Sequence, residues 1–302
     1  MANTTFNRYA ATADATPTVA LVTPAFNILP WASGTNVQLK SNSTVSPTML
    51  PNGASGGTYN TSYYVEGNFS GQFARDNAID LALQSLMMNT ISTKVLTAGS
   101  TEKPVCYEKA FFETAGTFYR QARGCQHSKF DLKWDADNVI EFSSDFTGIG
   151  DARSATIITG ATYVQPSNTV RLTGGDVTVT IGSLGTTQLK KGSLSISIPK
   201  KPQTICGSQF AVGVGTSGQR TVEYNFTFFK RDFAFETGLI GNTAQAVTLT
   251  MGAVNTGWKF ESAKVIFESP QDEEDDSGQL ISIKGVASYD TTALCDVKIT
   301  QL

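Results

Sequence analysis

The chain has 302 residues, a formal net charge of −3 and only 16% charged residues. Its length predicts two domains of about 150 residues each. The charge balance argues against the basic surface typical of nucleic-acid-binding domains, and the abundance of Gly, Ser and Thr favours short strands over long solvated helices. No apolar run approaches the ~20 residues of a membrane span, and residues 1–9 lack a signal-peptide core, so we expect a cytosolic chain without membrane insertion.

The elements begin with an N-terminal stretch, 1–30, that contains three prolines: Pro17, Pro24 and Pro30. Because proline lacks the amide that a strand ladder needs, we predict an extended arm here rather than a central strand. Apolar and polar residues then alternate over 37–40 and 63–74, on either side of a polar stretch rich in Gly, Pro and Asn. This pattern predicts a β-hairpin with a long tip, residues 44–60.

A helix is predicted directly after the second strand of this hairpin, with Asp76 as its N-cap. The apolar residues that follow have helical spacing: Ile79, Ala82, Leu83, Leu86 and Met87. Such a stripe should cover the apolar face of a sheet.

Further strands are predicted wherever the alternation recurs. In the first half these are 105–112, 118–124, 128–134 and 139–146. In the second half they are 177–181, 194–198, 221–229, 247–251, 263–268, 280–289 and 295–300. A second long hairpin tip is predicted over 199–220, and a shorter helical segment over about 231–240.

A near repeat links the two halves. Glu66-Gly67-Asn68-Phe69 precedes Arg75-Asp76, and Glu223-Tyr224-Asn225-Phe226 precedes Arg231-Asp232, so the copies lie 157 residues apart. Self-similarity on this scale indicates a duplicated unit. We therefore predict a mainly β protein of two tandem β-sandwich or barrel units, 1–150 and 151–302, each with one short covering helix and a long β-hairpin.

Several motifs suggest chemistry but lack its structural context. Residues 53–57 match G-x-S-x-G and residues 213–218 match G-x-G-x-x-G, yet a strand is predicted after each where the chemistry needs a helix. The acidic run 272–276 lacks the spacing of a calcium loop, so a solvated loop is expected. His127 is the only histidine and has no nearby acid or nucleophile in sequence. We predict no enzymatic activity.

No metal or cofactor is predicted either. The four cysteines form no C-x-x-C pair, so a zinc site would be short of ligands, and free buried thiols are expected: Cys106, Cys125, Cys206 and Cys295.

The pattern resembles a known family. The opening Met1-Ala2-Asn3-Thr4-Thr5-Phe6-Asn7-Arg8 is similar to the start of many bacteriophage tail tube proteins (major tail proteins) of long-tailed phages. The strand, Arg-Asp turn and helix over 64–88 resemble that family's "strand, then small helix" unit. So does the stretch from Phe118-Tyr119-Arg120 through Gly124-Cys125 into 130–134 and 139–148. The resemblance is strongest over 1–150 and stays in register over 151–302.

The resemblance implies that inner sheets join around a ring with the helices outside, and that stacked rings form a hollow tube for DNA delivery. Such rings usually hold six units, so a two-unit chain would close with three chains and pseudo-sixfold symmetry. The implied partners are further copies of the chain, the tape measure, tail terminator and distal tail proteins, and double-stranded DNA in transit. The implied location is the phage tail, after assembly in the host cytoplasm.

Two sets of residues are candidates for these roles. The polar faces of the alternating strands are expected to line the channel: Glu66, Asn68, Ser70, Gln72, Glu141, Ser143, Asp145, Glu223, Asn225 and Thr227. The hairpin tips are expected to contact neighbouring rings: Met49, Leu50, Asn52, Ile205, Phe210 and Val212. A polar and acidic lining would avoid the phosphate contacts through which basic residues hold DNA.

Two structural alternatives stay open. Tandem β-sandwiches also form adhesins and tail-tip binding modules, although such a chain should show an export signal or an aromatic-rich exposed loop. A contractile-tail tube is equally compatible with the sequence.

Overall fold

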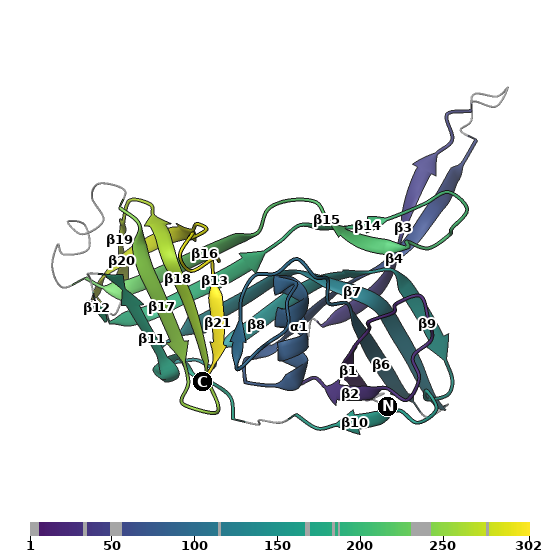
Figure 1. Ribbon diagram of the computed structural model, residues 1–302, viewed down its shortest axis with the longest axis horizontal. Coiled ribbons are helices and arrows are strands. Elements are labelled where there is room, and N and C mark those ends of the chain that lie inside the picture. The colour runs from purple at the N-terminus through teal and green to yellow at the C-terminus, as the bar shows by residue number, and fades with distance from the viewer. Residues whose placement is uncertain are drawn as a thin grey trace.

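The computed structural model describes residues 6–32, 35–48, 56–113, 116–166, 170–182, 185–186, 188–230, 243–275 and 278–302. Within these ranges the chain is mainly β, as predicted, with one α-helix, α1 (Asn77–Met87) (Figure 1). The strands up to residue 164 are β1 (Phe6–Ala13), β2 (Ala25–Ile28), β3 (Asn36–Val45), β4 (Thr58–Gln72), β5 (Val95–Leu96), β6 (Val105–Glu113), β7 (Gly116–Asp135), β8 (Glu141–Gly148), β9 (Gly150–Ser154) and β10 (Thr162–Val164).

The later strands follow a short 3₁₀ turn, η1 (Gly174–Asp176). They are β11 (Val177–Ile181), β12 (Gly185–Thr186), β13 (Leu189–Ser197), β14 (Lys200–Gln203), β15 (Gly213–Thr216), β16 (Thr221–Phe229), β17 (Gln245–Met251), β18 (Trp258–Phe267), β19 (Gln271–Asp275), β20 (Gly278–Ala287) and β21 (Lys298–Gln301).

One continuous antiparallel sheet runs through both halves of the chain, in the order β3-β4-β8-β7-β13-β16-β20-β19. The two halves join where β7 pairs with β13 over 129–135 and 191–197. The resemblance implied that inner sheets join, and within this chain the junction is the ladder between β7 and β13.

A second layer covers one face of this sheet. In the first half it consists of β1, β6, β9 and the N-terminal part of β7; in the second half β11, β17, β18 and β21 form it. The prediction of two strands at 118–124 and 128–134 is wrong, because β7 is a single 20-residue strand that serves both layers. Its ladder with β8 is irregular between His127 and Lys129. Its ladder with β6 is irregular between Ala122 and Cys125, where Gly124 has a φ of +60° that glycine adopts without strain.

The prediction for the helix is confirmed. The Asp76 carboxylate accepts a 2.9 Å hydrogen bond from the Ala78 amide, and all five stripe residues are buried. The stripe residues Ile79, Leu83, Leu86 and Met87 pack into the same core as Trp258 and Ile299 from the other half. The predicted second helix, at 231–240, lies outside the described residues.

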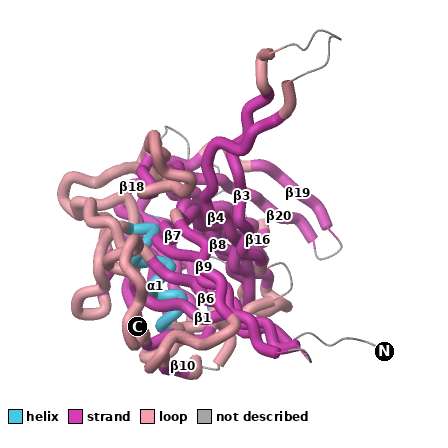
Figure 2. Tube along the Cα trace, turned by 90° about the vertical axis from the view of Figure 1, so that its right-hand side faces the viewer, coloured by secondary structure: helices cyan, strands magenta, loops and turns pink. Residues whose placement is uncertain are grey.

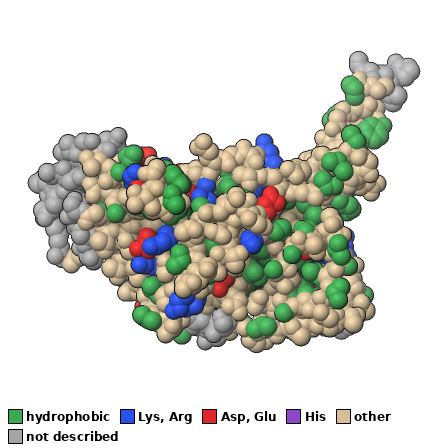
Figure 3. All heavy atoms as spheres, viewed as in Figure 1, with side chains coloured by type: hydrophobic (Ala, Val, Ile, Leu, Met, Phe, Trp, Pro, Cys, Tyr) green, Lys and Arg blue, Asp and Glu red, His purple; other side chains and the backbone are tan. Residues whose placement is uncertain are grey.

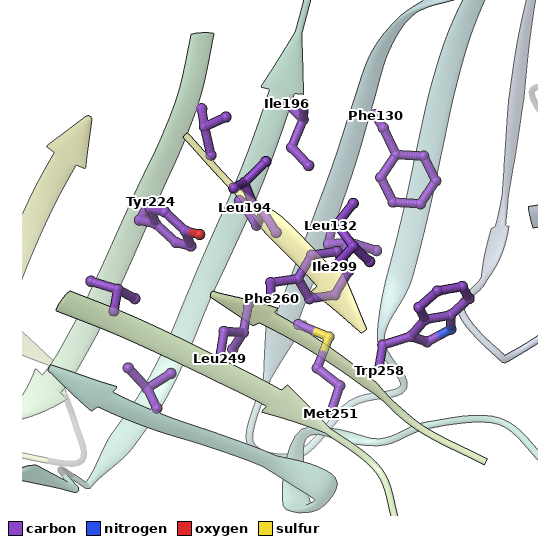
Figure 4. Close-up of a cluster of buried hydrophobic side chains, with 14 of the residues drawn as sticks. Phe130, Leu132, Leu194, Ile196, Tyr224, Leu249, Met251, Trp258, Phe260 and Ile299 are labelled. Atoms are coloured by element: carbon purple, nitrogen blue, oxygen red, sulfur yellow. The ribbon is translucent and has the colours of Figure 1, made fainter. Parts of the chain in front are cut away.

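The largest core lies between the two layers and crosses the junction of the halves. Figure 4 shows side chains from β7, β13, β16, β17, β18 and β21 converging on this core, including Leu132, Leu194 and Phe260. One apolar core shared in this way holds the halves together, because separating them would expose it to water.

The N-terminal stretch differs from the prediction of an extended arm. Residues 6–13 form β1 and pair with β6 along their whole length. The prolines all lie after this strand, so they do not interrupt its ladder. The stretch that follows is held by Asp14, whose carboxylate accepts bonds of 2.8 and 2.7 Å from the Arg123 guanidinium.

The strand pairings repeat in the two halves. Five strand pairs of the first half have counterparts in the second half. β1–β6 corresponds to β11–β17, β3–β4 to β13–β16, β4–β8 to β16–β20, β6–β7 to β17–β18, and β7–β8 to β18–β20. The registers agree as well, since Asn36 lies opposite Asn68 and Ser193 lies opposite Asn225, in both cases 157 residues later.

The chain does not change halves at residue 150. β9 pairs with β7, and β10 pairs in parallel with β2, so residues 150–164 still pack with the first half. The first strand that pairs wholly within the second half is β11. The strand pairing therefore divides the chain between 164 and 177, later than the predicted boundary.

Candidate functional site

All ten candidate lumen residues lie on one face of the continuous sheet, opposite the core. One cross-strand row runs Gln72, Glu141, Lys133, Ser193, Asn225 and Lys284. The next row runs Ser70, Ser143, Asp131, Ser195 and Glu223, and it ends in the apolar Val286 and Ile266. Directly opposite residues in a ladder share a face, so each row crosses both halves on the same side. We call this surface the polar face.

The polar face exists because buried and partly exposed side chains alternate along the strands, as they do in β4. Val65, Phe69 and Phe73 are buried in the core, while Glu66, Asn68 and Ser70 between them are partly exposed. A slip of one residue would turn the apolar set outward, so burial of the core determines which side chains the face presents.

Four lysines that were not among the candidates lie between the carboxylates of the polar face. Lys129, Lys133, Lys191 and Lys284 occupy the same rows as the predicted residues. The polar face therefore carries charges of both signs, in addition to the polar and acidic side chains of the candidate set. The signal was present in the sequence, because Lys133 alternates with Leu132 and Trp134 in the pattern that predicted the strand.

Several charges on the face are matched by a neighbour. The ammonium of Lys129 lies 2.6 Å from an Asp131 carboxylate oxygen, and this hydrogen bond raises the pKa of Lys129. The ammonium of Lys284 lies 4.0 Å from the Glu223 carboxylate. The Asn68 amide donates a 2.6 Å bond to Asp145 across the ladder from β4 to β8. Exposed pairs of this kind contribute little stability, about 0–1 kcal/mol each, but they reduce the net charge of the surface.

The candidates differ in exposure. Gln72 and Glu141 are exposed and most of the others are half-buried. Thr227 is buried, and its hydroxyl shares a 2.8 Å hydrogen bond with Ser282. In this structure it therefore contributes little surface to the polar face.

The candidate ring-to-ring residues fall in two hairpins. Met49, Leu50 and Asn52 lie outside the described residues. Ile205 and Val212 are exposed in the β14–β15 hairpin. Phe210 is also exposed, but its ring centroid lies 5.8 Å from that of Tyr63, so it contacts the base of the β3–β4 hairpin in the same chain.

The remaining motifs have ordinary structural roles. Residues 213–216 of the G-x-G-x-x-G match form strand β15, which leads to β16 and not to a helix. The expectation that the acidic run is a loop is wrong, since Gln271–Asp275 form β19 at the edge of the sheet. His127 is fully buried between Tyr107 and Ser144, and burial lowers its pKa to about 3.

Among the described residues, no His, Cys, Asp and Glu side chains gather into a group that could hold a metal ion. All four cysteines are free; Cys106, Cys125 and Cys295 are buried as expected, whereas Cys206 is exposed. No helix in the described part of the chain is long and apolar enough to cross a membrane.

The fold is a two-layered β structure that presents one broad polar face. The family of phage tail tube proteins has a model that matches residues 4–293, and the chain belongs to this family. No curated protein matches the chain. The family supports a structural role in the virion, self-assembly into a tube and contact with other tail proteins.

Proposed function

We propose that three copies of the chain close into a ring, that the rings stack into the phage tail tube, and that the polar face lines the channel through which DNA passes. The observation that supports this most is the sheet that continues across both halves with all ten candidate residues on one side. In a ring, this sheet would continue from chain to chain, and two units in each of three chains would give pseudo-sixfold symmetry.

The sheet ends in two edges that suit such closure. Among the described residues, β3 pairs only with β4, and β19 pairs only with β20. Unpaired edges invite pairing with another chain, and closure into a barrel removes them. The acidic residues Asp272, Glu273 and Glu274 on β19 would limit uncontrolled pairing with the same edge of another chain, because like charges would face each other.

The junction inside the chain suggests the register between chains. β20 is the counterpart of β8, and Ser282 takes the place of Ser143. Asp131 on β7 lies opposite Ser143, and Gln271 on β19 lies opposite Ser282, so β19 corresponds to the C-terminal part of β7. β3 corresponds to β13. Within the chain Lys133 lies opposite Ser193; the corresponding pair between chains is Glu273 and Asn36.

A disulfide tests both the register and the stoichiometry. Asn36→Cys with Glu273→Cys, in a Cys206→Ser background, should oxidise in assembled particles to covalent products that stop at three chains. Asn36→Cys alone is the control and should give no such series. A series that continues to six chains would overturn the three-chain ring, and persistent monomers in negative-stain microscopy of the unaltered protein would overturn tube formation.

The mixed charge of the polar face supports passage of DNA without retention. A carboxylate ~8 Å from a phosphate costs only ~0.5 kcal/mol in water, and salt reduces this further. Lysines held by carboxylates, such as Lys129 by Asp131, are less available to bind phosphate and release its counterions. DNA would then meet weak interactions of both signs in every ring.

The family extends the proposal to partners and place. The tape measure protein would occupy the channel before DNA, and the tail terminator and distal tail proteins would contact the two ends of the tube. Assembly would take place in the host cytoplasm. The candidates Met49, Leu50 and Asn52 in one hairpin and the exposed Ile205 and Val212 in the other would contribute to ring-to-ring contacts.

A further inference from the structure

We propose that the projecting β3–β4 hairpin docks on the second half of a neighbouring copy of the chain, in the way that the β14–β15 hairpin docks on the first half within the chain. This inference rests on the proposed assembly into rings and adds the specific surface that receives the hairpin. The argument depends on the duplication, which makes a docked hairpin and an undocked one directly comparable.

The docked hairpin shows what the contact looks like. β14 and β15 extend from β13 and β16 along one edge of the first half, towards β3 and β4 (Figure 1). The amide of Tyr63 donates a 2.7 Å bond to Gln209, and the amide of Ala211 donates a 2.9 Å bond back to Tyr63. Val214 and Ala211 pack on Ile149, so the contact has an apolar part as well as backbone hydrogen bonds.

A buried lysine completes this contact. The Lys200 ammonium donates 2.8 Å bonds to the Gln126 side chain on β7 and to the Thr216 hydroxyl on β15. Under the hairpin, Gln126 is 3% exposed and Thr147, its partner in the ladder, is 7% exposed.

The corresponding surface of the second half is uncovered. In the first half Thr147 lies opposite both Gln126 and Glu66. In the second half Val286 lies opposite both Ile266 and Glu223, and Glu223 is the counterpart of Glu66. Val286 therefore corresponds to Thr147, and Ile266 corresponds to Gln126. Here both side chains are apolar, yet Ile266 is 38% exposed and Val286 is only half-buried. The segment that follows β20 in the chain also has exposed apolar residues, with Tyr289 58% and Leu294 66% exposed.

The β3–β4 hairpin is the element that the duplication assigns to this surface. It projects away from the rest of the chain in both views (Figures 1 and 2), and hydrophobic side chains lie along it (Figure 3). Its apolar residues Val45 and Tyr59 are exposed. Tyr59 is the counterpart of Thr216, 157 residues later, and Ile266 is the counterpart of Gln126. Because Lys200 links Thr216 to Gln126 through hydrogen bonds, we expect Tyr59 to contact Ile266 of the neighbouring chain.

The geometry of the edges agrees with this assignment. β13 pairs with β7 and continues into the hairpin that covers β7 and β8. If β3 pairs with the β19 edge of a neighbour, its hairpin is directed over β18 and β20 of that same neighbour. Inside the chain the contact is polar, between Lys200 and the side chains of Gln126 and Thr216. The surfaces that we assign to the contact between chains, Tyr59 on one and Ile266 on the other, are apolar and exposed, as expected of surfaces that associate after folding.

Photo-crosslinking tests the contact directly. With p-benzoylphenylalanine in place of Tyr59, irradiated tubes should yield two-chain products joined to residues 258–267 or 286–294. Ile266→Asp should raise the protein concentration needed for tube formation at least tenfold. Ile157→Asp, a control at a similarly exposed isoleucine of the first half, should leave that concentration unchanged.

The outcomes separate this inference from the proposed function. Tubes whose crosslinks from position 59 fall in the first half or in the β14–β15 hairpin would overturn the docking surface and leave the tube intact. Tubes that form equally well with Ile266→Asp would overturn it too. An unaltered chain that stays monomeric would overturn both proposals.

Discussion

The two long hairpins are built alike, but one lies on the body of the molecule and the other projects from it. β14–β15 is held against the first half through Tyr63 and Lys200. β3–β4 extends beyond the sheet, with Val45 and Tyr59 exposed. The second-half hairpin has another half of the same chain to cover, whereas the first-half hairpin has none. The same element is therefore docked or free according to whether a partner surface exists within the chain.

A second contrast concerns how the two halves fill the same space. In the first half Gly67 on β4 lies opposite Phe146 on β8. At the same place in the second half Tyr224 on β16 lies opposite Gly285 on β20. The aromatic ring and the glycine have exchanged strands, which shows that the duplicated core preserves the combined volume and not the individual residues.

The largest effect is expected from shortening the projecting hairpin. Replacing residues 46–57 with Asn-Gly would join Val45 to Thr58, which already pair, through a two-residue turn suited to a hairpin. We expect a folded chain with an unchanged unfolding temperature that forms no tubes in negative-stain microscopy. Tubes of normal appearance would show that the projecting part of the hairpin is dispensable.

The exchanged aromatic pair can be tested by transplanting it. A Cβ at Gly67 would lie 2.1 Å from Cζ of Phe146, so Gly67→Tyr should destabilise the chain by about 3 kcal/mol or more in urea unfolding. Adding Phe146→Gly copies the arrangement of the second half and removes the clash with the ring, so it should recover part of this loss. The rest should remain, because the added Cβ also lies 2.6 Å from the Asn36 carbonyl oxygen on β3. A double variant no more stable than Gly67→Tyr would mean that the two halves do not pack equivalently.

Acid sensitivity should depend on His127, which corresponds to Phe267 in the second half. Burial lowers its folded pKa to about 3, so between pH 6.5 and 3 the unfolded chain binds a proton that the folded chain does not. The free energy of unfolding should therefore fall as the pH drops through this window, by about 1.4 kcal/mol for each unit at most. His127→Gln should flatten the dependence, measured as the difference between the two proteins. Parallel pH curves would contradict this account.

The smallest effect on the folded chain is expected from the polar face. Glu66→Lys with Glu223→Lys changes one partly exposed residue in each half and breaks the Glu223–Lys284 pair, so stability should fall by no more than about 1 kcal/mol and tubes should form. DNA ejection should be slower, because each added lysine can contact phosphates in every ring. Ser70→Thr with Ser195→Thr on the same face is a neutral control. Unchanged ejection kinetics would count against the assignment of this face to the channel.

Local pattern predicted much of this fold. The alternation of Val65, Phe69 and Phe73 with Glu66, Asn68 and Ser70 identified both the strand and its wet face, because side chains alternate across a sheet whatever lies beside it. Asp76 marked the start of α1 because capping depends only on neighbouring amides. Strand 221–229 was predicted with the same bounds as β16.

Contacts distant in sequence were not predictable from it. Proline content placed 6–13 in an arm, whereas pairing with β6 makes it a strand. The acidic run at 272–275 is poor in β-forming residues, and its pairing with β20 makes it an edge strand despite that composition. In both places a neighbouring ladder outweighed local preference.

The sequence by itself determined most of the strands, the helix α1 and the duplication, since these depend on spacing along the chain. The tertiary structure decided that β7 and β13 join the two halves into one sheet, and that lysines and carboxylates from both halves share its polar face. It also decided which hairpin is docked. Register between distant strands follows from how the core packs, and packing depends on residues that no local pattern relates.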